Sequence, residues 1–363
     1  MQYKIKVGIT HGDINGIGYE VILKVLEDER ILELCTPVIY GSAKIAATYR
    51  KMFEDMPIIP LNQINSAAEA RHDANNIVNV IPEEVRPEPG QATKEAGSAA
   101  FIALEQAVAD LRNGDIDVLV TAPINKAMIQ SDTFSFPGHT EYLEAVSSES
   151  GSKALMIMCS DTLRVALQTT HLPLSKVAES ITKDGIVDKL HSFKRSLQRD
   201  FGVNAPRIAV LGLNPHAGDN GFLGTEEQEI IAPAIDEARQ KKVMAFGPYS
   251  ADGFFGAGLY KKFDGVLAMY HDQGLAPFKA IAMDAGVNFT AGLQIVRTSP
   301  DHGIGYDIAG KGVASPESMR AAIYTAIDIY RNRRNEAETF RSPLRRQYYE
   351  KGSDNVVLDL TGE

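Results

Sequence analysis

Residues 6–34 read KVGITHGDINGIGYEVILKVLEDERILEL: a short β-branched run, a glycine-rich turn and an amphipathic helical stretch. The same order returns where TPVIY precedes SAKIAATYRKMF, and TKEAGSAAFIALEQAVADLRNG is followed by IDVLVTAP. Strands that alternate with helices of this length are typical of a largely parallel sheet covered by helices. The sequence therefore predicts an α/β fold, with further strands at ALMIMCS, LRVALQTT, RIAVLGLN, GVLAMYH and LQIVRTS, and a long helix in PESMRAAIYTAIDIYRNRR.

The size and charge of the chain narrow its class. Its 363 residues, 44% of them hydrophobic, supply enough apolar material for two domains. The net charge of −10 argues against a nucleic-acid partner, because such proteins usually present a basic face. The N-terminus reads as a strand rather than a secretion signal, and no apolar run is long enough to span a bilayer. We therefore expect no membrane partner and a cytoplasmic location.

Two cysteines, Cys35 and Cys159, lie in separate apolar segments without CxxC spacing. This pattern favours small core residues over a disulfide framework or a cysteine-based zinc site.

Polar residues follow five of the expected strands directly. IDVLVTAP runs into INK, LRVALQTT into His171, RIAVLGLN into PHAG, GVLAMY into HDQG, and LQIVRT into SPDHG. Ligands of parallel sheets gather at the carboxyl ends of the strands. Five polar strand ends therefore indicate one shared binding mouth.

Three of the eight histidines, His171, His216 and His271, stand immediately beyond an apolar strand. Neutral imidazole is a ligand for zinc and similar divalent ions, and Asp219 and Asp272 would be nearby carboxylates that orient the rings. The spacing matches no short metal motif, so the alternative that these are structural histidines stays open. His72 and His191 lie in polar or charged stretches and are expected to face solvent, whereas His11, His139 and His302 are flanked by glycine and are further candidates.

Two glycine-rich stretches come close to known phosphate-binding motifs without matching them. GDINGIGYE follows the first strand and opens a helix, where N–H groups could receive phosphate. Its glycines, Gly12, Gly16 and Gly18, do not have the GxGxxG spacing of a Rossmann fingerprint. GYDIAGKG ends in Gly312 where a P-loop needs Ser or Thr, so a P-loop NTPase is rejected.

Three polar residues of the C-terminal third, Lys279, Asn288 and Arg297, lie near the ends of expected elements. A lysine and an arginine facing one cleft would hold a phosphate or carboxylate, although surface ion pairs explain them equally well. In GFLGTEEQEII, Thr225 and Gln228 have the spacing of a helix capping box, so that segment is first assigned a structural role.

Seven motifs together resemble the 4-hydroxythreonine-4-phosphate dehydrogenase family of the pyridoxal phosphate pathway. They come in that family's order: GITHGDINGIGYE, TAPINK, FPGHTEYL, TTHLPL, LNPHAGDNGFLGTEE, AMYHDQG and VRTSPDHG. The resemblance implies two α/β/α domains flanking a cleft, similar to isocitrate and isopropylmalate dehydrogenases. We expect one domain from residues 1–125 and 290–363, and a second from residues 126–289 with metal-binding and dimerisation elements. It also implies a homodimer whose active sites lie at the subunit interface.

The resemblance assigns roles to individual residues. It implies a divalent metal, zinc first with magnesium or cobalt as alternatives, on His171, His216 and His271. Substrate contacts are implied for His139, Thr140, Lys279, Asn288 and Arg297. Lys279 and Asp252 are expected to transfer protons. NAD, with NADP as an alternative, is expected to contact Gly12, Asp13, Gly16, Asp301 and His302.

Two departures from the family pattern leave the coenzyme choice open. The family usually reads close to GDPAGIGPE, whereas this chain has Ile14 and Tyr19 in place of the two prolines. The usual DHGTALDLAG is DHGIGYDIAG here.

The implied reaction is NAD-dependent and metal-dependent oxidation of 4-phosphooxy-L-threonine, with decarboxylation to 3-amino-2-oxopropyl phosphate. The same chemistry on a four-carbon sugar-acid phosphate, such as threonate 4-phosphate, or on a ring dihydrodiol, is the nearest alternative. A three-histidine metal hydrolase or aldolase without nicotinamide, and a catalytically silent NAD-binding or metal-binding protein, are alternatives of other classes.

Overall fold

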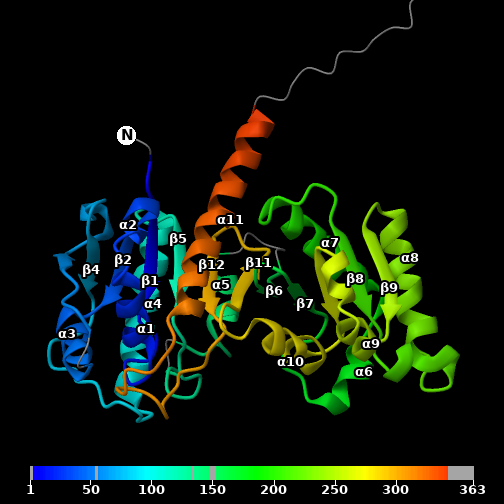
Figure 1. Ribbon diagram of the computed structural model, residues 1–363, viewed down its shortest axis with the longest axis horizontal. Coiled ribbons are helices and arrows are strands. Elements are labelled where there is room, and N and C mark those ends of the chain that lie inside the picture. Colours follow the sequence, from blue (N-terminus) through cyan, green and yellow to red (C-terminus); the bar gives the residue numbers. More distant parts are fainter. Residues whose placement is uncertain (1–2, 54–55, 132–133, 148–152, 342–363) are drawn as a thin grey trace, which may run out of the picture.

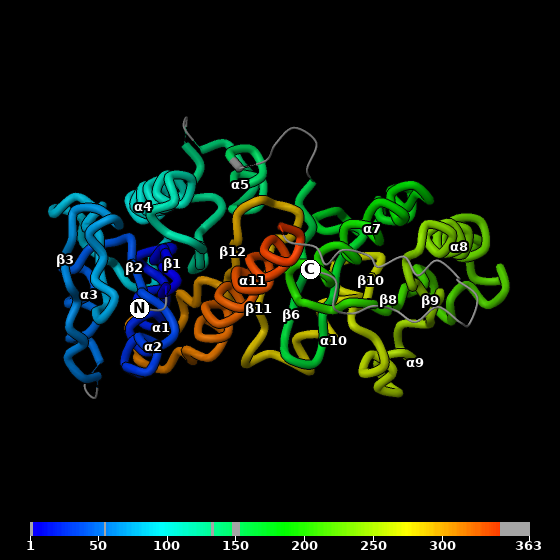
Figure 2. Tube along the Cα trace, turned by 90° about the horizontal axis from the view of Figure 1, so that it is seen from above, coloured from blue at the N-terminus to red at the C-terminus, as the bar shows by residue number. Residues whose placement is uncertain are grey.

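The computed structural model describes residues 3–53, 56–131, 134–147 and 153–341. Its strands form one twelve-stranded sheet in the order β3-β4-β2-β1-β5-β12-β11-β6-β7-β10-β8-β9 (Figure 1). Helices cover both faces of this sheet, so the expected α/β class is confirmed. Figure 2, a view from above, shows α4, α5, α7 and α8 along one side of the trace and α1, α9 and α10 along the other.

One block of the sheet is parallel throughout. Its strands are β3 (Leu61–Ile64), β4 (Asn75–Asn79), β2 (Cys35–Gly41), β1 (Ile5–Thr10), β5 (Val118–Thr121) and β12 (Arg297–Pro300). The opening stretch of the sequence supplies the centre of this block, where Ile9 of β1 pairs with Ile39 on one side and Val120 on the other. All three side chains are buried, as the β-branched runs predict.

The other block joins the first through antiparallel strands. Its strands are β11 (Val287–Ala291), β6 (Leu155–Cys159), β7 (Arg164–Leu167), β10 (Gly265–Ala268), β8 (Arg207–Leu211) and β9 (Met244–Tyr249). β11 is antiparallel to both β12 and β6, and β6 is antiparallel to β7; from β7 to β9 the strands are parallel again. The largely parallel sheet is thus confirmed. Because β12 lies in one block and β11 in the other, the chain crosses between the blocks after Ala291 and before Arg297. The expected division into domains stays a prediction.

The helices begin and end where the sequence supplies caps. Thr93 accepts a hydrogen bond from the main-chain N of Ala96 (3.2 Å) at the start of α4, and Gly114 ends that helix with φ 80°. The α-helices are α1 (Gly18–Leu26), α2 (Ile31–Leu34), α3 (Ala43–Met52), α4 (Lys94–Asn113), α5 (His139–Ser147), α6 (Val177–Ser180), α7 (Lys183–Arg199), α8 (Ala232–Gln240), α9 (Ala251–Gly256), α10 (His271–Ala282) and α11 (Glu317–Arg341). Short 3-10 helices are η1 (Ala67–Glu69), η2 (Leu174–Lys176), η3 (Pro215–Gly221) and η5 (Leu259–Lys262), and η4 (Glu227–Ile231) is a π-helix.

Several minor predictions can be checked in the described residues. Cys35 and Cys159 are buried free thiols, which confirms that they are core residues. His72 is exposed as expected, whereas His191 is half-buried on α7. The helical segment begins directly after Thr225, as expected, although it continues as the π-helix η4, whose N-cap Glu226 makes no side-chain cap bond. No described helix combines the length and apolarity needed to cross a membrane.

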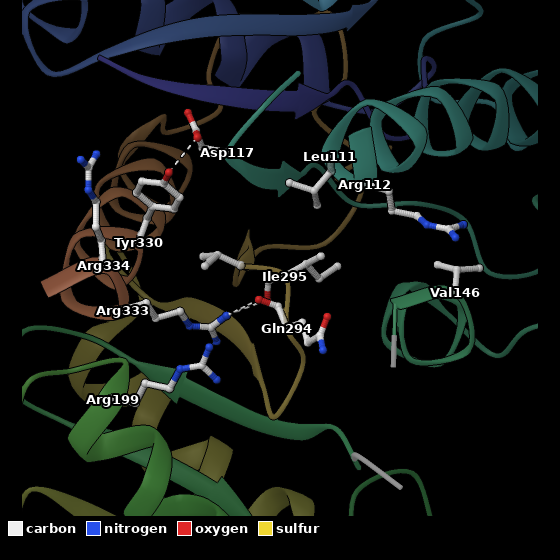
Figure 3. A pocket seen from close by; sticks show the side chains of 11 residues that line it. Leu111, Arg112, Asp117, Val146, Arg199, Gln294, Ile295, Tyr330, Arg333 and Arg334 are labelled. Carbon is white, nitrogen blue, oxygen red and sulfur yellow. Dashed lines mark hydrogen bonds between the residues drawn. The ribbon is translucent and has the colours of Figure 1, made fainter. Parts of the chain in front are cut away.

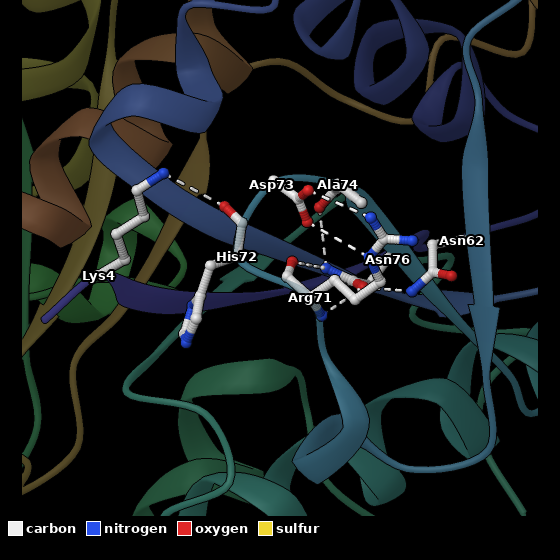
Figure 4. A network of polar contacts seen from close by, with 7 residues as sticks. All are labelled: Lys4, Asn62, Arg71, His72, Asp73, Ala74 and Asn76. Carbon is white, nitrogen blue, oxygen red and sulfur yellow. Dashed lines mark hydrogen bonds and ion pairs between the residues drawn. The ribbon is translucent and has the colours of Figure 1, made fainter. Parts of the chain in front are cut away.

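The outer edge of the sheet is held by polar contacts around Asn76 of β4 (Figure 4). Asn76 Nδ2 donates to the main-chain O of Arg71 and of Ala74, each at 2.9 Å. Lys4 Nζ donates to the main-chain O of His72 at 3.3 Å. These hydrogen bonds hold the loop before β4 in place. His72 belongs to this loop, so its position needs no role in a site.

Candidate active site

The fold brings His171 and His271 together. Their strands β7 and β10 are neighbours, and the pairing continues past the strand ends, where the main-chain N of Thr169 donates to the main-chain O of Met269 (3.2 Å). Each histidine follows two residues later, and the two ring centroids lie 6.2 Å apart. His271 Nδ1 is 2.7 Å from Asp272 Oδ1, the contact expected of an orienting carboxylate.

His216 lies on the segment that follows β8, the strand on the other side of β10. It is exposed in η3 and has the left-handed backbone angles φ 52° and ψ 29°. Asp252 is an exposed residue of α9 that accepts a hydrogen bond from Ser250 Oγ. This bond, the Gly253 N–H and the nearby His216 together lower the pKa of the Asp252 carboxyl. Within the described part of one chain, no three His, Cys, Asp or Glu side chains are placed to hold a metal ion. The structure thus brings His171 and His271 together, and no group of three ligands that includes His216 forms within the described part of one chain.

His139 and His171 share charged neighbours on other elements. Burial lowers the pKa of His171, and the charge of Lys126 lowers it further against an opposing effect of Glu141. Burial, Arg297 and Lys126 together hold the pKa of His139 well below its usual range. Both imidazoles are thus kept neutral near pH 7. The sequence alone predicted no role for Lys126 or Glu141. Lys126 nevertheless lies in the motif TAPINK and Glu141 in FPGHTEYL, both of which match the family.

Arg297 is a buried cation at the start of β12, with only 3% of its surface exposed. Its Nε donates to Thr121 Oγ1 at 3.0 Å and its Nη1 to Thr290 Oγ1 at 3.2 Å. Burial lowers its pKa to about 10, the charge of Glu141 opposes that shift, and no carboxylate among the described residues forms an ion pair with it. A guanidinium buried among hydroxyl groups is suited to an anion that arrives with a ligand.

Two other predicted substrate residues carry unused polar atoms. His139 Nε2 and Asn288 Oδ1 are buried and have no hydrogen-bond partner. Asn288 lies on β11 directly opposite Ser299 of β12, two positions from Arg297. Thr140 follows His139 in the first turn of α5 and is half-buried.

Lys279 and Asp301 form an ion pair, with Lys279 Nζ 3.2 Å from Asp301 Oδ1. Burial raises the pKa of the Asp301 carboxyl, and Lys279 opposes that shift. The second oxygen, Asp301 Oδ2, is buried without a partner. Next to it, burial lowers the pKa of His302, whose Nδ1 lies 2.9 Å from the main-chain O of Gly303. Lys279, which is expected to act on the substrate, thus contacts Asp301, which is expected to contact the coenzyme.

The glycine-rich loop after β1 is buried and internally bonded. The main-chain N of Asp13 donates to the main-chain O of Pro123 (2.9 Å), and that of Gly16 donates to the main-chain O of Asp13 (3.1 Å). Gly12 has φ 70°, and a Cβ there would lie 2.3 Å from Pro123 O, so only glycine fits. These N–H groups already have acceptors, so the geometry gives no support to their receiving a phosphate. Contacts of Gly12, Asp13 and Gly16 with the coenzyme stay a prediction.

His11, another candidate from the sequence, belongs to the core. It is fully buried, stacks on Tyr19 with ring centroids 5.2 Å apart, and has no partner for either ring nitrogen. Burial lowers its pKa to about 4. Ring stacking accounts for its position.

A hollow elsewhere in the molecule contains none of the predicted site residues. This cavity of about 680 Å³ lies between α4, α11 and the loop joining β11 to β12, and several arginines line it (Figure 3). Arg333 Nε donates to Asp200 Oδ1 at 2.7 Å, and its Nη1 donates to the main-chain O of Gln294 at 2.8 Å. Arg333 therefore anchors the loop between β11 and β12.

A sheet with histidine, lysine and arginine side chains at the ends of several strands has the layout of an α/β enzyme. Residues 33–326 match the family described as pyridoxal phosphate biosynthetic protein PdxA. The chain belongs to the PdxA family, and this membership makes it a dehydrogenase by class.

Named relatives extend over nearly the whole chain. It is 57% identical to a 4-hydroxythreonine-4-phosphate dehydrogenase of Bacteroides thetaiotaomicron, covering 99% of both chains. The enzyme of that name from Sulfurihydrogenibium sp. is 42% identical, over 91% of this chain and 100% of that one. The crystal structure of the Klebsiella pneumoniae enzyme of that name superimposes with a TM-score of 0.77 at 35% identity, covering 91% of this chain and 98% of the other.

Proposed function

We propose that the protein oxidises 4-phosphooxy-L-threonine with NAD and a divalent metal ion, and decarboxylates the product to 3-amino-2-oxopropyl phosphate. The observation that carries this proposal is Arg297, a buried guanidinium that forms no ion pair with a carboxylate among the described residues, although the charge of Glu141 reaches it. A substrate anion would supply the missing charge. The names of the close relatives support the same substrate.

The substrate would be held by groups whose polar atoms are unused. Arg297 would bind one anionic group of the substrate through charge-assisted hydrogen bonds. His139 Nε2 and Asn288 Oδ1, both buried without a partner, would bind its polar groups, and Thr140 lies beside His139. A phosphorylated amino acid offers two anionic groups and one ammonium group to such a site. Because buried polar groups are costly when unpaired, these side chains would discriminate against a substrate that lacks a matching group.

The histidine pair fits a metal ion in its chemistry. The ring of His171 is kept neutral and that of His271 is oriented by Asp272, and the two rings lie 6.2 Å apart between centroids. His171, His271 and His216 would hold zinc, or magnesium or cobalt in its place, and we propose a homodimer whose active site lies at the subunit interface. When bound, the metal supplies Lewis-acid polarisation of the substrate oxygen, and NAD accepts the hydride.

Proton handling is assigned to Lys279 with Asp301. Lys279 Nζ lies at the end of β12 beside Asp301 and donates to the main-chain O of Asp301 at 3.4 Å. A lysine ammonium held in this way would donate a proton to the carbon that loses carbon dioxide. Asp252, whose pKa is lowered mainly by Ser250, stays ionised and would accept a proton rather than donate one. NAD, or NADP in its place, would contact Asp301 and His302.

The test is to identify the products by mass spectrometry after incubation with NAD, with and without a chelator. Two substrates are compared, 4-phosphooxy-L-threonine and threonate 4-phosphate. The proposal expects 3-amino-2-oxopropyl phosphate from the first substrate, lost with chelator and restored by zinc. Faster turnover of threonate 4-phosphate would move the assignment to sugar-acid phosphates. Turnover of either substrate without reduction of NAD would instead favour a hydrolase or aldolase.

A further inference from the structure

The segment that carries His216 has an unusual backbone. His216, Ala217, Gly218, Asp219 and Asn220 all have left-handed angles, with φ values of 52°, 51°, 81°, 43° and 56°. L-residues avoid this region, and a run of several non-glycine residues there persists only where the surroundings enforce it. We refer to residues 216–220 as the left-handed run. It therefore needs support from side chains outside itself.

Glu227 supplies that support from the first residue of η4. Its side chain is buried, with 3% of the residue exposed. Glu227 Oε1 accepts hydrogen bonds from the main-chain N of Leu213 and of Asn214, each at 2.7 Å. Glu227 Oε2 accepts one from Asn214 Nδ2 at 3.0 Å. The carboxylate thus holds the chain just before it enters the left-handed run.

The same carboxylate also touches the middle of the run. A Cβ on Gly218 would lie 2.6 Å from Glu227 Oε2, so the glycine and the carboxylate are in close contact. The π-turn at η4 begins at Glu227, and such turns occur frequently at functional sites. One buried side chain thus bonds to the entrance of the segment that carries His216 and lies close to its centre.

Gln273 connects this segment to the one that carries His271. Gln273 Oε1 accepts from the main-chain N of Met269 at 2.7 Å. Gln273 Nε2 donates to the main-chain O of Gly212 at 2.6 Å. Gly212 and Met269 directly follow the neighbouring strands β8 and β10. Gln273 therefore links the ends of β8 and β10 by hydrogen bonds beyond the last backbone pair of these strands.

We infer that Glu227 and Gln273 are positioning residues that set His216 relative to His271 without touching either ring. The inference rests on the proposed function, because it gives the two histidines a shared purpose as metal ligands. Its structural part, the dependence of the position of His216 on Glu227, can be measured without any metal.

The experiment compares Glu227→Gln with Glu226→Gln in the full-length protein. Glutamine at 227 keeps the size but turns an N–H donor toward Asn214 Nδ2. Glu226 is the matched control, since its Oε2 accepts from Asn214 Nδ2 at 2.7 Å but binds neither main-chain N–H group. Histidine ring signals are recorded by NMR on metal-free protein labelled at histidine and assigned with His216→Gln. Zinc affinity is measured separately by competition with a chromophoric chelator.

We expect Glu227→Gln to shift or broaden the His216 signal and to weaken zinc binding by roughly 10- to 100-fold, while Glu226→Gln changes both little. Gln273→Met should perturb the His216 and His271 signals together, and it keeps the inference testable if Glu227→Gln does not fold. Wild-type signals and zinc affinity in folded Glu227→Gln would overturn the inference. If wild-type protein binds no zinc while Glu227→Gln still moves the His216 signal, the proposed metal site fails and the positioning by Glu227 stands.

Discussion

His171 and His271 lie with their ring centroids 6.2 Å apart and their ring planes tilted by 39°. One hundred residues separate them in the chain, and they meet because their strands, β7 and β10, are parallel neighbours. The charge of Lys126 helps to keep His171 neutral. The charges of Lys279 and His271 both act on the Asp301 carboxyl. Through these couplings, the ends of β5, β7, β10 and β12 face one shared region.

Arg297 should matter for ligand binding and not for folding. Replacing it by methionine removes a buried charge that Glu141 offsets only without an ion pair, so the free energy of unfolding should stay level or rise. Binding of the phosphorylated substrate should weaken by roughly 100-fold, because a buried charge pair is lost. The measurement is the melting temperature with increasing inorganic phosphate, which should rise for the wild type and not for Arg297→Met.

The control for this prediction is Arg71→Met, which removes a surface arginine lying 3.1 Å from Asp73. It should change the free energy of unfolding by no more than about 0.5 kcal/mol and leave the response to phosphate intact. A strongly destabilised Arg297→Met, or one that phosphate still stabilises, would mean that Arg297 is a structural residue.

Lys279→Met should lower kcat by roughly 100-fold, the usual contribution of a proton-transfer group. It should also change the pH dependence of stability. The pKa of Asp301 is raised by burial and Lys279 opposes this, so loss of the lysine raises that pKa further. A carboxyl with a raised pKa in the folded state takes up protons that the unfolded chain does not hold, so acid favours folding. As the pH falls from 7 toward the ordinary carboxyl pKa of about 4, Lys279→Met should therefore gain stability relative to the wild type.

Lys279→Arg separates the two effects. Arginine keeps the charge beside Asp301 and should restore the wild-type stability profile, but it holds its proton too tightly to restore kcat. Denaturant titrations across this pH range, together with steady-state rates, check both. Full activity in Lys279→Met would exclude the assigned role.

His11 should make the protein sensitive to acid. Its pKa is lowered from 6.5 to about 4 by burial, so between these values only the unfolded chain takes up the proton. The free energy of unfolding should fall as pH drops through this window, by roughly 3 kcal/mol in all, and should be unaffected above it. In His11→Phe, about 2 kcal/mol of the loss between pH 7.5 and pH 5 should disappear.

The matched control for this prediction is Tyr19→Phe, which keeps the ring stack with His11 and adds no titrating group. Its loss of stability in acid should equal that of the wild type. An unchanged acid profile in His11→Phe would assign the effect to another group.

Gly218→Ala should destabilise the protein by about 1–3 kcal/mol. The residue has φ 81°, and the added methyl group would lie 2.6 Å from Glu227 Oε2. Gly256→Ala on α9 is the control, because a Cβ there meets nothing within 4 Å. Chemical denaturation of both variants measures the difference. Equal stabilities would show that the left-handed run relaxes at little cost.

The sequence predicted the central strands well because they are β-branched and buried on both faces. It missed β3, β4, β9 and β11, which are short or contain polar or proline residues, as in LNQI and MAFGPY. Such strands form because neighbouring strands offer hydrogen-bond partners, and a local pattern does not record this.

For the site, the sequence identified individual residues but did not show which of them lie close together. Histidines beyond apolar strands could be recognised, but the pairing of His171 with His271 depends on strand order. Glu227 was interpreted as part of a helix start, because the spacing of Thr225 and Gln228 fits a capping box. Its contact with the left-handed run depends on tertiary packing, and no local signal predicts five consecutive positive φ angles.

The most direct test of the central claim is the near-ultraviolet absorbance of NADH formed from 4-phosphooxy-L-threonine and NAD. It is followed in wild-type protein, with and without chelator, and in His271→Ala. We expect the wild type to form NADH. NADH formation should be lost with chelator or in His271→Ala, and it should return when zinc is added to the chelated wild type. NADH formation that survives both the chelator and the loss of His271 would contradict the assignment of the histidine pair to a metal-dependent dehydrogenase.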